Sequence, residues 1–150
     1  MILSAQAIAE LTATRKIHFL NQQATRIDRS LGDAAGLKNL GVHLIEVAPG
    51  HYSTERHSHH YEEECLYILS GQATAELGDE TFTVGAGDFI GYPCHGPAHT
   101  LFNSGQEMLV CLVVGQRLDH DITDYPDQQK RLFRHQGDRS LVNQADISQP

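Results

Sequence analysis

The sequence predicts an all-β fold, built as a sandwich or a small barrel. Its regular segments are short and read as half-buried strands, and glycine-containing turns separate them about every ten residues. No helical period of useful length interrupts the series. These observations together make a helical or mixed α/β domain a poor description of the chain.

The predicted strands fill the middle of the chain. They cover residues 42–47, 64–69, 72–77, 80–84, 88–91, 100–102 and 108–114. Gly78 and Asp79 form a hairpin turn between two of them, and Gly85 and Gly87 mark the next turn. Residues 64–69 are apolar on both faces, which predicts a strand in the middle of the sandwich.

The N-terminal flank has a weaker pattern. Residues 4–12 contain helix formers behind a Ser4 cap, so we expect no more than a turn or two of helix. An edge strand is expected around residues 25–29, and a loop with a glycine near each end follows over residues 31–41.

The C-terminal flank, after Gly115, is polar and poor in long apolar runs. We expect it to lie over the surface, with one or two short strands near residues 130–134 and 139–142. The expected organisation is one domain over residues 1–150, made of an irregular N-terminal arm (1–39), a barrel core (about 40–115) and a C-terminal tail (116–150).

Composition narrows the function classes. The chain has 150 residues and a formal net charge of −8, with no Lys/Arg run that could neutralise a row of phosphates, so a nucleic-acid partner is not expected. No apolar run suits a signal peptide or a membrane span, and we expect a cytoplasmic protein. Its three cysteines share no close spacing, which fits reduced thiols better than a disulfide framework.

Histidines are concentrated between His51 and His99, a stretch that holds six of the ten in the chain. His57 and His59 are two residues apart and therefore share one face of an extended strand. Glu64 opens the most apolar predicted strand, and His99 begins another. Three neutral imidazoles and one carboxylate suit a divalent transition metal such as Zn, Fe, Mn, Ni or Cu. A six-coordinate metal would keep two positions open for water, substrate or dioxygen, which points to function.

Two glycine-rich motifs surround these residues. The first consists of Gly50, His57, His59, Glu64 and Gly71, and the second of Gly87, Pro93, Gly96, His99 and Asn103. Their spacing resembles the two signature motifs of the cupin superfamily, with one extra residue after Gly50 and one after Pro93. Both extra residues fall in loops, which tolerate insertions. The segments RIDRSLGDAAGL, YILSG, GAGDFIGYP, HTLFN and DYPD further resemble small single-domain bacterial cupins, some labelled sugar-phosphate isomerase-like.

Cupin resemblance implies a double-stranded β-helix, the jelly-roll barrel of this superfamily. It also implies a metal held at one end of the barrel by the matched residues His57, His59, Glu64 and His99. It does not imply a reaction, because cupins include dioxygenases, isomerases, epimerases, storage proteins and ligand sensors.

Alternatives for these ligands stay open. A slip in the bend after His59 could present Glu63 instead of Glu64, and an early strand end could present His60 instead of His59. His95 is expected at the rim of the pocket, where Cys94 beside it could act as an extra ligand or a reactive thiol.

Other polar side chains near the motifs are weaker candidates for lining the pocket or binding a substrate. Tyrosines could line the pocket, although strand tyrosines are usually packing residues. The candidates are Tyr52, Tyr61, Tyr67 and Tyr92. Arg56 should point away from His57 on an extended strand, which makes it a poor substrate ligand.

Two function classes are compatible with the sequence. The first is a metal-dependent enzyme, an isomerase or dioxygenase acting on a small polar substrate, with Glu62, Glu63, His60 or His95 as general base. The second is a non-catalytic cupin that binds a small molecule as a sensor. In either class we expect a homodimer, because a sandwich of this size has edge strands that need covering.

Overall fold

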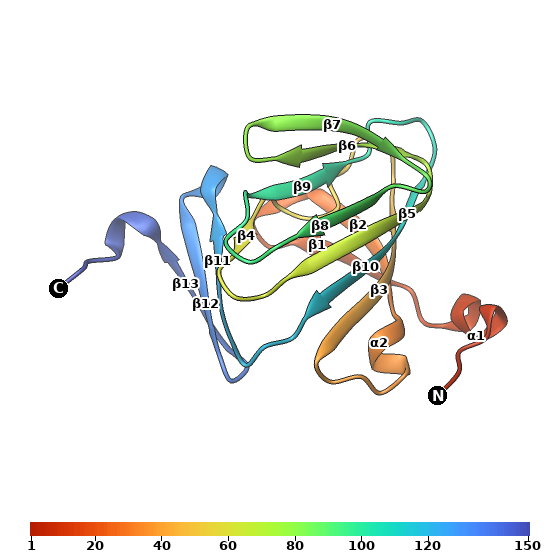
Figure 1. The fold of residues 1–150 in the computed structure, drawn as a ribbon, viewed down its shortest axis with the longest axis horizontal. Helices are drawn as coiled ribbons and strands as arrows, with labels where there is room; N and C mark the ends of the chain where they lie inside the picture. Colours follow the sequence, from red (N-terminus) through yellow and green to blue (C-terminus); the bar gives the residue numbers. More distant parts are fainter.

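A computed structural model describes residues 1–150, and strands dominate it (Figure 1). The N-terminal half contains α1 (Ala5–Glu10), β1 (Thr14–His18), β2 (Asn21–Ser30), α2 (Leu31–Ala34), β3 (Leu40–Val47), β4 (Ser58–His59), β5 (Glu64–Ser70) and β6 (Gln72–Leu77). The C-terminal half contains β7 (Glu80–Gly85), β8 (Phe89–Tyr92), β9 (His99–Phe102), β10 (Leu109–Gln116), β11 (His120–Tyr125), β12 (Lys130–His135) and β13 (Asp138–Asn143), with 3-10 turns at Pro126–Gln128 and Gln144–Asp146. The predicted all-β class is confirmed.

Three antiparallel sheets make up the fold. The largest has the strand order β1-β2-β3-β10-β5-β8, and the smaller ones have the orders β13-β12-β11-β4 and β7-β6-β9. Isolated bridges from Tyr52 to Phe102 and from His57 to His99 connect the chain before β4 to β9. These bridges connect the two smaller sheets to each other through the segment that leads into β4.

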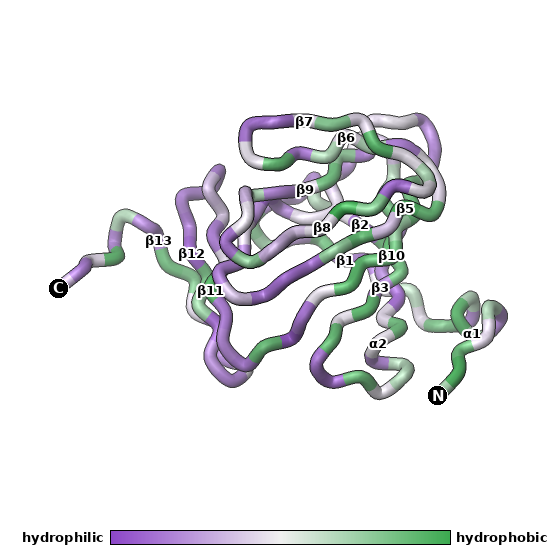
Figure 2. Tube along the Cα trace, in the orientation of Figure 1, coloured by the Kyte–Doolittle hydropathy of each residue, from purple (hydrophilic) through white to green (hydrophobic).

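The core lies between the large sheet and the β6–β9 layer. Its most completely buried side chains are Ile45, Val47, Ile68, Leu101 and Leu109. Figure 2 shows hydrophobic stretches along β3, β5 and β10, and more hydrophilic ones along β11 and β12. The apolar core therefore occupies one part of the barrel, and the part next to β11 and β12 is more polar.

Residues of both glycine-rich motifs stabilise the turns at the core end of the barrel. Asn103 is fully buried, and its amide donates to the carbonyl oxygens of Val47 (2.7 Å) and Glu107 (2.9 Å). Gly71 has φ = 88°, and a Cβ there would lie 2.8 Å from the Met108 carbonyl oxygen. Only glycine suits that position, because other residues rarely adopt a positive φ and the carbonyl is backbone.

Most predicted strands are confirmed to within one or two residues, and so is the short N-terminal helix with its Ser4 cap. The 64–69 prediction was wrong in one respect. Only one face of β5 is buried, because Tyr67 and Leu69 are 43% and 48% exposed.

The flanks are more regular than predicted. β2 is no edge strand, since β1 and β3 pair with it on either side, and α2 lies in the segment predicted as a loop. The polar stretch after Gly115 forms three strands, of which β11 was not predicted, and β11 pairs with β4. Neither α-helix has the length and hydrophobicity that crossing a bilayer requires.

Candidate metal centre

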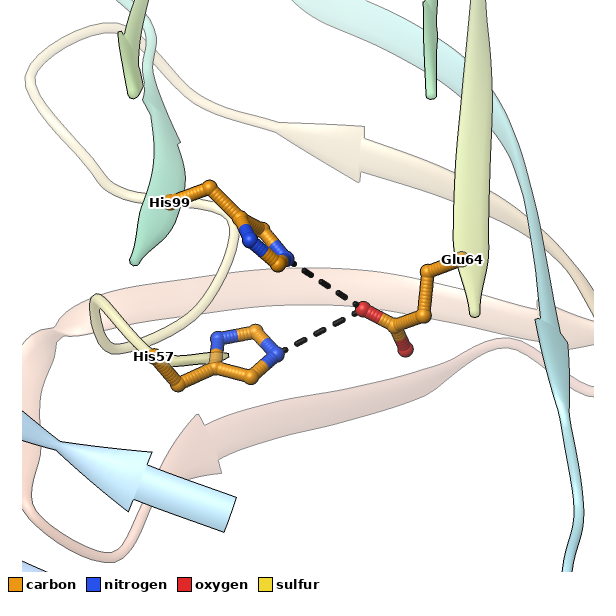
Figure 3. Close-up of side chains that lie close together, drawn as sticks. All are labelled: His57, Glu64 and His99. Atoms are coloured by element: carbon orange, nitrogen blue, oxygen red, sulfur yellow. Dashed lines mark ion pairs between the residues drawn. The ribbon is translucent and has the colours of Figure 1, made fainter. Parts of the chain in front are cut away.

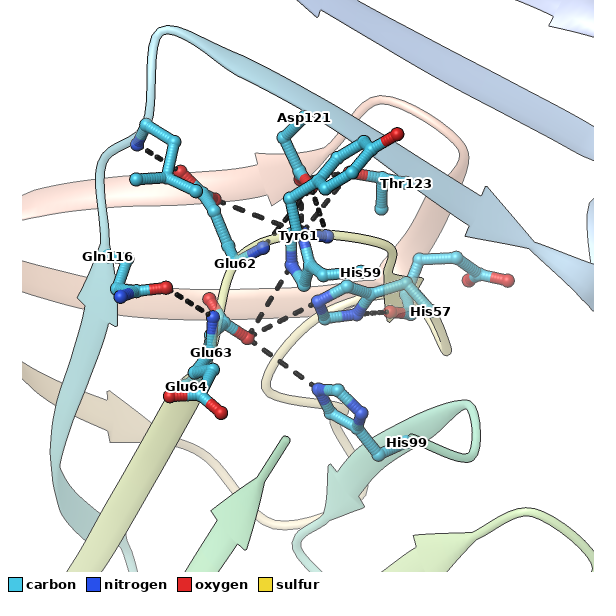
Figure 4. Close-up of polar contacts among 12 residues, drawn as sticks. His57, His59, Tyr61, Glu62, Glu63, Glu64, His99, Gln116, Asp121 and Thr123 are labelled. Carbon is cyan, nitrogen blue, oxygen red and sulfur yellow. Dashed lines mark hydrogen bonds and ion pairs between the residues drawn. The ribbon is translucent and has the colours of Figure 1, made fainter. Parts of the chain in front are cut away.

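Three imidazoles surround one carboxylate oxygen inside the barrel. The Oε2 atom of Glu64 lies 3.4 Å from Nε2 of His57, 3.7 Å from Nε2 of His59 and 3.6 Å from Nε2 of His99. Figure 3 shows the Glu64 carboxylate between His57 and His99, and Figure 4 adds His59 on the third side. The structure brings together all four residues that the sequence predicted as ligands.

Local backbone structure places these side chains. His57 and His99 exchange both backbone hydrogen bonds, at 3.1 and 2.8 Å, which puts their rings 4.7 Å apart. Glu64 enters from β5 in the opposite sheet, and a Cβ on Gly115 would lie 3.1 Å from its Oε1 atom. Tyr92 stacks flat on the His99 ring with a centroid distance of 3.7 Å. The ligand cluster is therefore held by strands of all three sheets, since Glu64 lies on β5, His99 on β9 and His59 on β4.

The outer nitrogen of each imidazole has an acceptor. Nδ1 lies 2.8 Å from the Glu55 carbonyl oxygen in His57, 3.2 Å from the Pro97 carbonyl oxygen in His99, and 2.5 Å from Asp121 Oδ2 in His59. A proton on each Nδ1 leaves each Nε2 with a lone pair that points towards Glu64. Metal-binding histidines are typically oriented by such partners.

This arrangement has more acceptors than donors. Burial alone would raise the pKa of the Glu64 carboxyl, and His57 and His99 imidazoles that donated from Nε2 would hold that pKa well below its usual range. With the protons on Nδ1 instead, only a cation can stabilise the carboxylate in the same way. His99 Nε2 is buried without a hydrogen-bond partner, and burial lowers the pKa of this imidazole. Lone pairs that converge on a carboxylate repel one another unless a cation lies among them, so the donor set fits a divalent metal.

His59 is the ligand candidate with the strongest electrostatic support. Burial would lower its pKa, but the hydrogen bond to Asp121 and the charge of Glu64 raise it. Asp121 is 2% exposed and also accepts from the backbone N–H groups of Tyr61 (3.1 Å) and Glu62 (3.4 Å). One carboxylate thus fixes both the ring of His59 and the bend that leads to β5.

A second group of acidic residues lies beside the first. His59, Glu62 and Asp121 have potential ligand atoms within 4.8 Å of one another. However, His59 offers Nδ1 there, which already faces Asp121, and Glu62 accepts from the backbone N–H of Leu118 and pairs with Arg134. These contacts describe a hydrogen-bonded support for His59 rather than a cation site.

An inner cavity of about 350 Å³ opens onto the four candidate ligands. Side chains from all three sheets line it, among them Arg26, Thr54, Tyr125, Arg134 and Arg139. Burial raises the pKa of the Tyr125 phenol to about 12, so this group remains a proton donor at neutral pH. The cavity is large enough for a small polar molecule in contact with the metal candidates.

The other predicted site residues lie elsewhere. Glu63 is exposed and accepts nothing from the histidines, while His60 pairs with Asp124 at 2.9 Å. His95 is exposed and Cys94 is a free thiol, and neither lines the inner cavity.

Only one of the four tyrosine candidates, Tyr92, lines the inner cavity. Tyr61 and Tyr67 are exposed, and Tyr52 packs on Phe102. Arg56 points away from the centre, as predicted, and pairs with Asp127 at 2.9 Å. Tyr52, Tyr61 and Tyr67 therefore do not line the inner cavity, and Tyr52 has the packing role that is usual for a strand tyrosine.

The sequence matches the cupin-domain family over residues 43–115. A solved structure from Acidithiobacillus ferrooxidans, named provisionally as a sugar phosphate isomerase, is 51% identical, with a TM-score of 0.96 over 99% of this chain and 96% of its own. The chain belongs to the cupin superfamily. The jelly-roll fold predicted from the two motifs is confirmed by this likeness.

Two more distant structures share the cupin fold. One from Silicibacter pomeroyi, named as a sugar phosphate isomerase from a cupin superfamily, has a TM-score of 0.84 at 23% identity and covers 100% of this chain and 97% of its own. One from Thermotoga maritima, named as a predicted oxalate decarboxylase, has a TM-score of 0.65 at 24% identity over 79% of this chain and 100% of its own. A search of curated proteins found no match.

Several polar residues of this cupin were missed in the sequence. Asp121, Thr123 and Tyr125 lie on β11, and Arg134 and Arg139 follow on β12 and β13, all beyond the matched segment 43–115. The three β11 residues have one sequence signal, the alternation in DITDY, where every second residue is buried. The buried positions in this alternation are mostly polar, and a polar alternation does not predict a strand.

Proposed function

We propose that this cupin is a metal-dependent enzyme that acts on a small polar substrate. His57, His59, Glu64 and His99 would hold a divalent transition metal, with Zn, Fe, Mn and Ni as the candidates. The observation that carries the proposal is the convergence of three Nε2 atoms on Glu64 Oε2, at 3.4 to 3.7 Å, on the wall of the inner cavity.

Isomerisation of a hydroxy-carbonyl compound is the reaction to test first, ahead of dioxygenation. A relative that is 51% identical over nearly the whole chain is named provisionally as a sugar phosphate isomerase. A bound divalent ion would supply Lewis-acid polarisation of a carbonyl or hydroxyl oxygen. The polar cavity lining, with hydroxyl groups of Thr54 and Tyr125, suits a polyol better than an apolar substrate.

Glu62 is our candidate for the group that moves a proton. Of the four bases considered from the sequence, it alone lines the inner cavity. It is 4% exposed, and burial raises the pKa of its carboxyl, although the Leu118 N–H and Arg134 oppose that shift. A raised carboxyl pKa brings a base closer to neutral pH, where proton transfer is most efficient.

Turnover measurements on the metal-reconstituted protein test the proposal. Sugars, sugar phosphates, thiols and catechols would be offered with Fe(II), Mn(II), Zn(II) and Ni(II). We expect turnover that is lost with chelator and in His57→Ala and His99→Ala, together with their bound metal. His60→Gln is the matched control, because His60 pairs with Asp124 and points away from the cluster.

The outcomes separate the two function classes. Equal metal content in wild type, His57→Ala and His99→Ala would contradict the metal site. A full metal complement without turnover of any compound would instead favour the non-catalytic sensor.

The proposal includes a cytoplasmic homodimer. β1 and β8 are the edges of the large sheet, and Phe89 on β8 is 66% exposed. Exposed edges of this kind are commonly covered by a second copy. A monodisperse monomer by light scattering would contradict this part.

A further inference from the structure

An outer cavity of about 480 Å³ adjoins the candidate metal centre, and its charge is opposite to that of the whole chain. The chain has 19 acidic and 11 basic residues, yet no acidic residue lines this cavity. Five of the 11 basic residues do: Arg15, Lys16, Arg26, Arg134 and Arg139. Such a concentration of one charge in a concave surface attracts anions.

Two hairpins carry all five of these cations, and four of the five form like-charge pairs. Lys16 lies directly opposite Arg26 across β1 and β2, and Arg134 lies directly opposite Arg139 across β12 and β13. Like charges that face each other across strands destabilise a sheet. An anion bound between the hairpins would offset the part of that cost that Asp28 and Glu62 leave.

Three of the cations form ion pairs with buried carboxylates that do not line the cavity. Asp28 lies 3.1 Å from Lys16 Nζ and 3.5 Å from Arg26 Nε, and Glu62 pairs with Arg134. Arg139 has no ion-pair or hydrogen-bond partner among the described residues. The cavity therefore combines fixed cations with at least one guanidinium whose donors are free.

Both cavities share part of their walls. Residues common to the two linings are Arg26, Ser53, Thr54, His59, Tyr125, Arg134 and Arg139. His59 is also a candidate metal ligand, 3.7 Å from Glu64. A ligand that fills the outer cavity thus lies next to the metal centre, and one small molecule can reach both.

We propose that the outer cavity binds the phosphate group of a small phosphorylated sugar or polyol, whose hydroxyl or carbonyl end reaches the metal centre. This inference rests on the proposed function and adds the substrate class. A phosphate monoester carries nearly two negative charges at neutral pH and three acceptor oxygens. Arginine forks bind such a group through paired hydrogen bonds, so a phosphate group matches the five cations on the two hairpins better than a single carboxylate does.

The proposal also assigns a role to the flanks of the chain. The cations lie at residues 15–26 and 134–139, outside the cupin-domain match at residues 43–115. The barrel segment would thus supply the metal ligands, and the two hairpins would select the phosphorylated substrate.

Isothermal titration calorimetry on the metal-loaded full chain tests this inference. The probes are ribose 5-phosphate, ribose, inorganic phosphate and gluconate. Ribose 5-phosphate is expected to bind at least tenfold more tightly than ribose or gluconate, and inorganic phosphate more weakly but at the same place. Arg139→Gln should lower the affinity for ribose 5-phosphate about tenfold. The double variant that combines Arg139→Gln and Lys16→Gln should lower it about a hundredfold.

Two further variants make the result specific. Arg139→Lys keeps the charge and should retain most of the affinity. Lys38→Gln removes one charge from an exposed loop position outside both cavities and should change nothing. Thermal unfolding of each variant shows whether the fold is intact.

Three outcomes would overturn the inference. They are equal affinity for ribose and ribose 5-phosphate, equal or tighter binding of gluconate, and an Arg139→Gln effect no larger than that of Lys38→Gln. Repeating the titrations after the metal is removed with a chelator tests the outer cavity independently of the proposed function. Phosphate-dependent binding that survives in a chain without any metal affinity would support the outer site and contradict the metal centre.

Discussion

The barrel segment and the two flanking hairpins of this cupin contribute different chemistry to one site. Residues 43–115 contain all four candidate metal ligands and most of the apolar core. The hairpins β1–β2 and β12–β13 contain the cations of the outer cavity, and β11 adds Asp121. The comparison shows that the segment shared with the family contains the candidate metal ligands, while the neighbouring hairpins contain the charges that we propose select the substrate.

The C-terminal flank also stabilises one of the barrel's own candidate ligands. Asp121 on β11 holds His59 at 2.5 Å and organises the bend before β5. The division between the two regions is therefore one of chemistry and not of structural independence. Substitutions in the flanks can show how far the barrel's site depends on them.

Asp121→Asn is expected to have the largest effect among flank substitutions. The amide keeps an acceptor for His59 Nδ1 but loses the charge that supports it, so metal affinity should fall about tenfold to a hundredfold. Competition with a fluorescent chelator measures this affinity. Asp124→Asn is the control, because Asp124 makes a similar bond to His60 at 2.9 Å that does not reach the candidate ligands. If both variants bind metal like wild type, the barrel's site is independent of β11.

Asp28→Asn is expected to affect stability more than metal binding. Asp28 is 2% exposed, and although burial would raise its pKa, hydrogen bonds and charges from His43 and Lys16 lower it to about 2. A carboxyl whose folded pKa lies below its unfolded value of about 3.9 stabilises the fold above pH ~4, and this contribution disappears as the pH falls towards ~2.

The variant should therefore lose on the order of 2 kcal/mol of unfolding free energy at pH 7 and almost nothing near pH ~2. Urea unfolding across this pH range measures the difference, with the exposed Asp119→Asn as the control. A loss that is constant over the whole range would show that packing, and not ionisation of Asp28, is responsible.

The sequence was informative where strands bury an apolar face. Residues 72–77 and 80–84 were predicted as a hairpin and form β6 and β7, because small apolar residues such as Ala73 and Ala75 alternate towards the core. His57, His59, Glu64 and His99 were predicted together, and the structure places them together. Whether they bind a metal stays a prediction.

The flanks were harder to predict for a physical reason. The inward face of β11 carries Asp121, Thr123 and Tyr125, which line or support a polar cavity instead of an apolar core. Hydrophobic alternation is the main signal of a strand in a single sequence, and these positions do not show it. The contribution of Arg134 and Arg139 also depends on hairpin pairing between distant segments, which spacing in the sequence does not reveal.

Anomalous diffraction from crystals of the full chain, grown with equimolar Mn(II) or Fe(II), tests the central claim most directly. The account predicts one peak within about 2.0–2.3 Å of Nε2 of all three histidines and of a Glu64 carboxylate oxygen. Absence of any peak, or a peak between Glu62 and Asp121 instead, would contradict it.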